Sequence, residues 1–375
     1  GASCPPGRSS VAALIIYHTF SLLSTTFSFF LLYFPYYGLI LWTGILYGGI
    51  KHVRLKDKKK TFVCLAFLST VLLQSLRAEY VGGDMVQYLR GYTASARGGW
   101  LDPVFNFELI FRILIHTLAV FHVPRQGFIA IMSVLCQAPV FYFFYKRAKN
   151  PCLSILIYFT FGLFTFSFSG IRQMIAIGLF LLAVLQAEDE QWLKFTALIL
   201  LAAMFHKSAL IGIVVWPLSK IKVKNHIVHF LMLGAFIVEI FMAPAIIQVA
   251  ATLFGSYNTI QFTGAYACFL LYALIWFMSS LLIRCDAPWN LYINCMYLAA
   301  AIQCLGLYHM NIGRVGYYFA FFECLLIPEM IEKTTRSREL KLMLYVGCVA
   351  FCLLYFYKNT GWGYLGVSPY VLFWK

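Results

Sequence analysis

Two arginines lie in apolar surroundings where a positive charge is costly. Arg172 lies in "FSFSGIRQMIAIGLF" at 166–180, and Arg314 lies in "YHMNIGRVGYYFAFF" at 308–322. We predict that Ser169 and Asn311 cap the helices that follow, which places each arginine in a first helical turn. A cation there opposes the helix dipole, and burial in the membrane adds a further penalty. A bound phosphate would satisfy both the arginine and the free N–H groups of the helix end.

The alternative is an ion pair between each arginine and a carboxylate inside the membrane, for which Glu239 and Glu323 are available. Both glutamates lie deeper in their predicted helices than the arginines do. We therefore favour an anion site, with four neighbours as further substrate-binding candidates: Gln173, Asn311, Tyr317 and Tyr318.

The segment "LRAEYVGGDMVQYLRGY" at 76–92 is a second candidate region. Gly82 and Gly83 predict a turn, and in a helix after it Asp84, Tyr88 and Tyr92 would share one face. A carboxylate with two tyrosines can bind sugar hydroxyls, and the carboxylate can act as a general base. The alternative is a network of caps and salt bridges that holds the loop, with Arg77 or Arg90 as partners of Asp84.

A third region, "LAAMFHKSALIG" at 201–212, places His206 and Lys207 at the predicted end of a helix. His206 can deprotonate an acceptor hydroxyl or bind a diphosphate oxygen. The alternative is an ordinary packing role. His226 and His229 lie in a basic segment, and we interpret them as interfacial anchors.

The elements that hold these residues are membrane helices. The chain has 375 residues, of which 62% are hydrophobic and 11% charged, whereas soluble domains carry about a quarter charged residues. We predict an all-α polytopic membrane protein with a single helical domain at 11–375, and we interpret 1–10 as a tag remnant. About 13 helices (range 11–14) are expected, near 11–33, 36–50, 61–77, 126–145, 152–168, 170–187, 192–206, 209–219, 227–243, 263–283, 289–307, 312–331 and 340–357.

Basic blocks at 51–60, 146–150, 220–224 and 332–341 should all lie on the cytoplasmic side. The predicted outer side then carries mostly arginine, which binds phosphate or carboxylate in a bidentate manner. For two of these arginines, Arg97 and Arg125, we favour contact with lipid headgroups.

Two segments are expected to depart from simple spans. Glu108, Arg112 and His116 form a polar stripe at 105–121, which favours an interfacial helix on the outer face; the alternative is a span with its stripe inside the bundle. The run 209–219 is too short to cross alone, so we expect "FHKSALIG" to bend at membrane depth.

Several classes of function are disfavoured. The net charge of +15 comes mostly from short topogenic blocks, so nucleic acid is a poor candidate partner. The 11 cysteines lack metal-ligand spacing. No obvious acidic metal cluster lies on the predicted outer face, so we expect neither a cofactor nor a metal; the alternative is a metal held by Asp84 and Glu79. The phosphate-binding loop of ATPases and the common hydrolase motifs are also missing.

Five motifs in order resemble the EpsG-like branch of the Wzy-type O-antigen and exopolysaccharide polymerases. They read "RAEYVGGDMVQY", "IRQMIA", "FHKSALI", "NIGRVGYYF" and "GVSPYVLFW". The resemblance covers roughly residues 76–372 and departs before residue 60, where this chain has an additional apolar segment.

The resemblance implies a GT-C-like membrane glycosyltransferase in the bacterial plasma membrane. It would transfer a glycan from a polyprenyl (undecaprenyl) diphosphate to a sugar hydroxyl of another lipid-linked repeat unit on the outer face, with a flippase and a chain-length regulator as partners. Arg172 and Arg314 would hold the donor diphosphate, joined by Lys207, while Asp84 and His206 would position or deprotonate the acceptor. Developing charge on the leaving diphosphate would be stabilised by arginines instead of a metal. The alternatives are a flippase or transporter of an anionic lipid-linked sugar, and an O-antigen ligase.

Overall fold

The computed structural model describes residues 33–98, 107–222, 226–254, 266–284, 286–360 and 365–374. Helices dominate these residues, and the one β-bridge recorded among them joins Arg77 to Leu372. The predicted all-α class is therefore confirmed. The predicted tag remnant at 1–10 and nearly all of the predicted helix at 11–33 lie outside the described residues.

Short connecting segments divide the chain into many helices, and some of these segments contain Gly, Pro or Asn. α6, for example, begins where Asn150 accepts the N–H of Leu153 and Pro151 follows. The first half contains a helix at 33–52, α2 (Lys58–Ser75), α3 (Met85–Ser95), α4 (Leu109–Val120), α5 (Arg125–Arg147), α6 (Pro151–Thr160), α7 (Leu163–Ser169) and α8 (Ile171–Glu188). The second half contains α9 (Trp192–Ala203), the 3₁₀ helix η1 (Lys207–Val214), α10 (Val215–Lys220), α11 (His226–Phe254), α12 (Tyr266–Leu282), α13 (Trp289–Gly306), α14 (Met310–Val315), α15 (Tyr317–Ala320), α16 (Glu323–Thr334) and α17 (Arg338–Thr360).

Four described helices are long and apolar enough to cross a membrane: α5, α8, the 227–249 part of α11, and the 338–358 part of α17. A fifth arises if α6 and α7, which are bent by 52° at their junction, form one broken span. The chain is therefore a helical membrane protein, but the predicted count of about 13 spans is not confirmed. The expected single helices at 152–168 and 312–331 are each divided, the first at Gly162 with its φ of 95°, the second into α14, α15 and α16.

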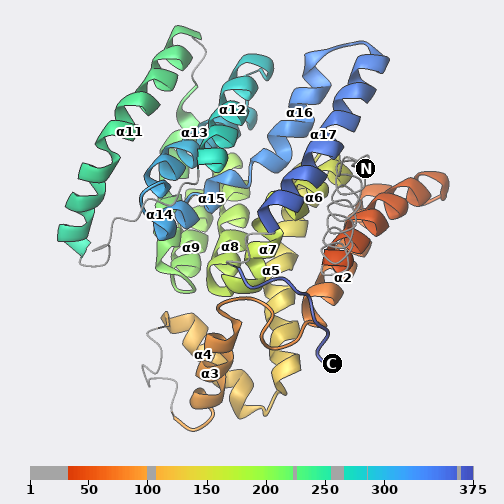
Figure 1. The fold of residues 1–375 in the computed structure, drawn as a ribbon, viewed down its shortest axis with the longest axis vertical. Coiled ribbons are helices and arrows are strands. Elements are labelled where there is room, and N and C mark those ends of the chain that lie inside the picture. Colours follow the sequence, from red (N-terminus) through yellow and green to blue (C-terminus); the bar gives the residue numbers. More distant parts are fainter. Residues whose placement is uncertain are drawn as a thin grey trace, which may run out of the picture.

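The four candidate spans differ in how far the rest of the chain covers them (Figure 1). Within α8, 72% of the apolar window is buried, whereas only 17% of the window in α11 and 11% of that in α17 are. Figure 1 accordingly places α5 and α8 in the middle of the molecule and α11 at one edge. The core that positions the site is thus built on α5 and α8.

The predicted cytoplasmic blocks gather at one end of the bundle, as far as they are described. Side chains from them join neighbouring segments there, in the pairs Tyr145 with Asp57, Lys149 with Glu329, Lys220 with Glu190, and Lys341 with Glu332. The last residues of α5 and α8 meet at this end through Arg147 and Glu188. Because Arg172 lies at the opposite end of α8, the candidate residues and the basic blocks occupy opposite ends of the bundle.

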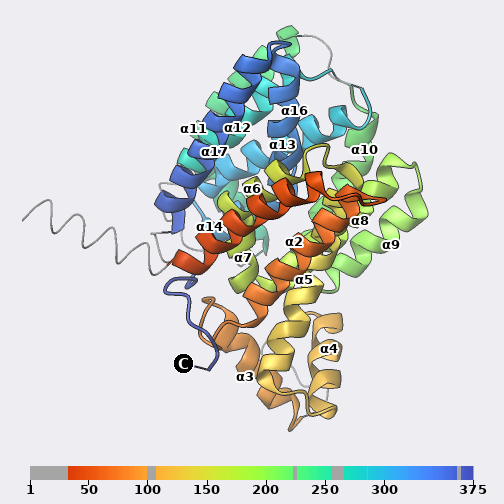
Figure 2. The ribbon, with the colours of Figure 1, turned by 90° about the vertical axis from the view of Figure 1, so that its right-hand side faces the viewer.

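Helices α3 and α4 form a small unit with the start of α5 at the end opposite to the basic blocks (Figure 2). α4 has 12 residues and is not among the candidate spans, which agrees with the predicted interfacial helix. Its stripe is used for contacts inside the protein, since His116 Nδ1 lies 3.0 Å from the carbonyl of Ser95 in α3.

The carboxyl-terminal segment 365–374 packs along the loop that precedes α3. The N–H groups of Gly82 and Gly83 donate to the carbonyls of Gly366 and Leu365, both at 2.7 Å. The hydroxyl of Tyr370 donates to the carbonyl of Leu73 at 2.6 Å. The motif "GVSPYVLFW" therefore supports the loop that carries Asp84.

Candidate functional site

The ends of five helices meet at the candidate site. Arg172 and Gln173 begin α8, His206 to Ser208 lead into η1, Arg314 ends α14, and Asp84 and Glu108 precede α3 and α4. A chain of contacts joins them: Asp84 with Arg314, the Arg314 carbonyl with Gln173, Arg172 with Glu108, and Glu108 with His206 and Lys207. The structure thus brings together the four residues predicted to be catalytic.

Arg172 is the second residue of α8 and makes an ion pair with the carboxylate of Glu108. Its guanidinium carbon lies 4.6 Å from the ring centroid of Phe107 and 5.8 Å from that of Tyr88, distances that allow cation–π attraction. The side chain is 21% exposed, and its Nε is buried without a hydrogen-bond acceptor among the described residues. Arg172 is therefore held in place and still has a donor to spare.

Glu108 connects three groups through one carboxylate. Oε2 binds Arg172, while Oε1 accepts the backbone N–H of Lys207 at 3.2 Å and lies 3.4 Å from Nδ1 of His206. Burial on its own would raise the pKa of Glu108, but the nearby His206 ring and the charge of Arg172 outweigh it and lower the pKa to about 2. The partner of Arg172 is thus Glu108, and neither Glu239 nor Glu323.

The predicted position of Arg314 in the first turn of a helix is wrong. Arg314 lies in the last turn of α14, not in the first turn of a helix, because α14 begins at Met310 after the N-cap His309 and already contains Asn311. A cation near a helix carboxyl end agrees with the helix dipole, so the expected match with Arg172 is wrong. Nη1 of Arg314 lies 3.9 Å from Oδ2 of Asp84, and Nε is buried without an acceptor among the described residues.

The predicted cap of α8 is also wrong. Ser169 is the last residue of α7, so it already has helical backbone, and the N-cap position falls to Gly170. The Ser169 hydroxyl instead accepts the backbone N–H of Asp84 at 3.2 Å. Gly82 lies at the same junction with a φ of 109°, where a Cβ atom would be 2.2 Å from the carbonyl oxygen of Phe168. The predicted Gly82–Gly83 turn is confirmed, and it brings Asp84 to α7.

The predicted substrate-binding residues form two groups, one at or near the contact chain and one away from it. Gln173 donates to the carbonyl of Arg314 at 2.8 Å, and the hydroxyls of Tyr318 and Ser208 lie 3.1 Å apart. Tyr88 is buried beside Arg172, the ring of Tyr317 lies 4.9 Å from that of Phe166, and Lys207 is exposed. These residues lie at or next to the contact chain, whereas Asn311 is exposed inside α14, three residues before Arg314.

The other predicted residues lie elsewhere. Arg77 is fully buried, and its Nη1 donates to the carbonyl of Phe168 at 2.7 Å. The Tyr92 hydroxyl donates to the carbonyls of Leu118 and Val123. Arg90 is exposed on the other face of α3. His229, predicted as an interfacial anchor, is buried against Trp276. Arg77 and Tyr92 therefore act as scaffold in this arrangement.

Glu108 and Ser208 are the site residues that sequence reasoning did not assign to the site. Glu108 could have been assigned to the site from the sequence, since it begins the polar stripe on α4. For Ser208 the only indication in the sequence was its position beside His206 and Lys207. Among the described residues, no three His, Cys, Asp or Glu side chains group as metal ligands would. The metal-independent reaction stays a prediction.

A family model described as the EpsG family matches residues 60–372. The chain belongs to the EpsG family. All the candidate site residues fall within the matched range, and so does the carboxyl-terminal segment that supports Asp84. Membership in the EpsG family gives the protein a general role of the polysaccharide-polymerase type at a membrane. No curated protein and no solved structure matches the chain.

Proposed function

We propose that this EpsG-family protein transfers a glycan from a polyprenyl diphosphate to a sugar hydroxyl of a second lipid-linked repeat unit, on the outer face of the bacterial plasma membrane. The observation that carries the proposal is the convergence of Arg172 and Arg314 at the start of α8, linked through Gln173. Each guanidinium has one carboxylate partner and one buried donor without an acceptor. The opposite end of the bundle holds the basic blocks, which supports an outward orientation of the site.

Diphosphate suits this pair of arginines. As the bond between the sugar and the diphosphate breaks, negative charge grows on the leaving oxygen, and fixed guanidinium groups stabilise that charge more than they stabilise the ground state. The first N–H groups of α8 have no acceptor within the helix. These N–H groups and the positive end of the helix dipole both favour an anion at the start of α8. Arg172 and Arg314 pair with the carboxylates of Glu108 and Asp84. Lys207, whose backbone N–H binds Glu108, adds a third positive charge beside them.

Glu108 would then act as an internal substitute for the substrate anion. While the site is empty, its carboxylate satisfies Arg172, which would otherwise be a partly buried and unpaired charge. A donor diphosphate would displace Glu108 from Arg172. The carboxylate would stay attached to the backbone of Lys207 and to His206, the contacts made by its other oxygen.

In the transfer step, the acceptor hydroxyl oxygen attacks the anomeric carbon of the donor. The bond from that carbon to the diphosphate oxygen breaks, and its electron pair leaves with the diphosphate. His206 takes the hydroxyl proton, with Glu108 orienting the ring from Nδ1, and Asp84 positions the acceptor. The opposite assignment, with Asp84 as the base, is tested by Asp84→Asn, which would then lose transfer from purified lipid-linked repeat units.

The experiment is to express Arg172→Ala and Arg314→Ala in a strain that lacks the native gene and to resolve the surface polysaccharide on a gel. Arg284→Ala is the matched control, because Arg284 is an exposed arginine paired with Asp286 in the loop before α13. The proposal predicts single repeat units in both site variants and a polymer ladder in the control. A normal ladder at normal protein level would contradict it. Lipid-linked polymer would indicate a ligase, and repeat units trapped inside would indicate a flippase.

A further inference from the structure

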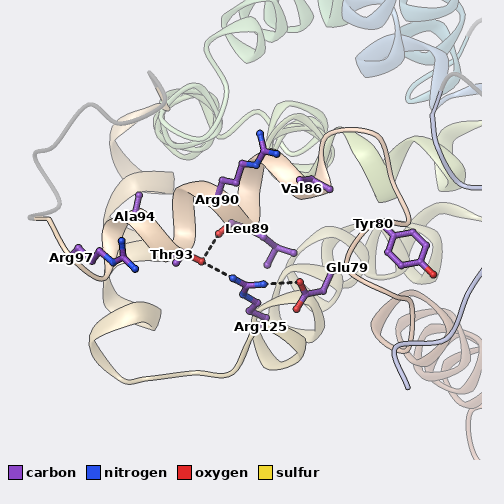
Figure 3. Close-up of a pocket in the computed structure, with 9 residues that line it drawn as sticks. All are labelled: Glu79, Tyr80, Val86, Leu89, Arg90, Thr93, Ala94, Arg97 and Arg125. Atoms are coloured by element: carbon purple, nitrogen blue, oxygen red, sulfur yellow. Dashed lines mark hydrogen bonds and ion pairs between the residues drawn. The ribbon is translucent and has the colours of Figure 1, made fainter. Parts of the chain in front are cut away.

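A second arginine-lined hollow lies on the exposed face of α3 (Figure 3). Its volume of about 540 Å³ lies within the roughly 300–1,000 Å³ that is typical of sites for small molecules. The lining residues are Glu79, Tyr80, Val86, Leu89, Arg90, Thr93, Ala94, Arg97 and Arg125. The hollow is distinct from the Arg172 cluster, because Tyr88 on the buried face of α3 contacts that cluster.

The lining combines the group types that bind sugars. Arg125 donates to Glu79 at 3.0 Å and to the hydroxyl of Thr93 at 3.4 Å, which fixes one wall. Arg90 and Arg97 are exposed, and no described carboxylate lies within ion-pair distance of either. The carboxylate of Glu79 can accept from sugar hydroxyls, and free guanidinium groups bind carboxylates in a bidentate manner.

An aromatic face completes the lining. Tyr80 is 58% exposed, and Figure 3 shows its ring beside Glu79 at the end of the hollow away from Arg97. An exposed aromatic ring offers an apolar face to the C–H side of a sugar ring, while its hydroxyl stays in water. The hollow thus has a stacking surface at one end and unpaired positive charge along α3.

The hollow also lies next to the candidate site along the chain. Val86 lines it and follows Asp84 by two residues, which is about 3 Å along a helix axis. Arg90 follows Val86 by about one turn of α3, and Arg97 lies just after the end of α3. A glycan whose reacting end lies beside Asp84 would therefore reach the hollow with its next sugars.

We propose that this hollow binds an acidic oligosaccharide, with sugar carboxylates on Arg90 and Arg97 and a sugar ring against Tyr80. Binding of the oligosaccharide in the hollow does not depend on a reaction at Arg172. Only the idea that the bound oligosaccharide is a substrate for glycan transfer rests on the proposed function. Lipid phosphate is the competing ligand class for such arginines. Glu79 and Tyr80 favour a sugar, because a carboxylate can accept from sugar hydroxyls and an aromatic ring can pack against the C–H face of a sugar, whereas a lipid phosphate uses neither group.

The test measures binding of a short fluorescent oligogalacturonate to the full-length protein in phosphatidylcholine nanodiscs, with a malto-oligosaccharide of equal length as the neutral probe. The wild type should bind the acidic probe more tightly. Replacing both Arg90 and Arg97 with alanine should weaken acidic binding roughly tenfold or more, and Tyr80→Ala should weaken both probes. Arg284→Ala, an exposed arginine outside the hollow, should bind like the wild type.

Equal affinity of the wild type and the double variant for oligogalacturonate would overturn the proposal. So would a double variant that binds sugar normally but has lost affinity for phosphatidylglycerol vesicles, because the hollow would then be a lipid contact. Arg90→Gln and Arg97→Gln, which keep long polar side chains, repeat the test if the alanine variant fails to fold. Arg172→Ala should still bind the oligosaccharide, so failure of the proposed transfer reaction is distinguishable from failure of this site.

Discussion

Arg77 and Arg172 lie in neighbouring regions of the molecule and have different kinds of partner. Arg77 is fully buried; its Nη1 binds the neutral carbonyl of Phe168, and its guanidinium lies 4.7 Å from the centroid of the Phe168 ring. Arg172 is partly exposed and pairs with the carboxylate of Glu108. Each keeps a buried Nε without an acceptor among the described residues, so that feature does not distinguish them.

The kind of partner decides what each arginine can do. A backbone carbonyl inside packed helices cannot leave its guanidinium unless the chain locally unfolds. A side-chain carboxylate at the start of a short helix can rotate away when a competing anion arrives. Arg77 therefore stabilises the junction of α7 with the Asp84 loop, whereas Arg172 has an exchangeable partner.

The largest expected effect is on transfer by Arg172 variants. Arg172→Ala should lower the rate of glycan transfer, measured with purified lipid-linked repeat units, by roughly 10²–10³-fold. This is the usual effect of removing a group that stabilises developing charge. Arg172→Lys should fall between the wild type and alanine, since it keeps the charge and loses the bidentate fork. The yield of folded protein should not change. A lysine variant as active as the wild type would show that charge alone is sufficient.

The next effect is on stability at Arg77. Arg77→Ala leaves the buried carbonyl of Phe168 without its donor, which should cost roughly 1–3 kcal/mol in the free energy of unfolding. The measurement is the midpoint of thermal unfolding in detergent, with Arg284→Ala as the control. Unchanged stability together with lost transfer would move Arg77 from the scaffold into the site.

Glu108→Gln should tighten donor binding by roughly severalfold, because the charged competitor for Arg172 is removed. The pH dependence of this gain follows from the pKa of Glu108, which is lowered from 4.5 to about 2. A lowered pKa means that the carboxylate stays ionised below its ordinary pKa of 4.5 and loses its ion pair only as the pH falls towards 2. The ratio of wild-type to variant affinity should therefore be flat between pH 5 and 8. A change in that ratio near pH 5 would contradict the lowered pKa.

The smallest effect is expected at Tyr92. Tyr92→Phe removes the hydroxyl that donates to the carbonyls of Leu118 and Val123, at a cost of about 1 kcal/mol in unfolding free energy. Transfer per folded molecule should be unchanged, because the hydroxyl faces the junction of α4 and α5. A loss of transfer without a loss of stability would return Tyr92 to the substrate-binding set.

Local sequence patterns predicted the helical class, the Gly82–Gly83 turn and the break of the helix at His206, because these depend on neighbouring residues. The two predicted helix caps are wrong because each residue already lies inside a helix: Ser169 ends α7, and Asn311 follows the first residue of α14. The pairing of Glu108 with Arg172 joins residues 64 apart, and nothing local encodes it. The burial of Arg77 depends on α7 in the same way, so sequence alone could not separate the two arginines.

The most direct measurement is thermal stabilisation of the purified protein by undecaprenyl diphosphate, with undecaprenyl monophosphate as the matched lipid. The diphosphate should raise the unfolding midpoint of the wild type and of Arg284→Ala, and it should raise the midpoint of Arg172→Ala and Arg314→Ala much less. Equal stabilisation of the wild type and both site variants would contradict a diphosphate site at these two arginines.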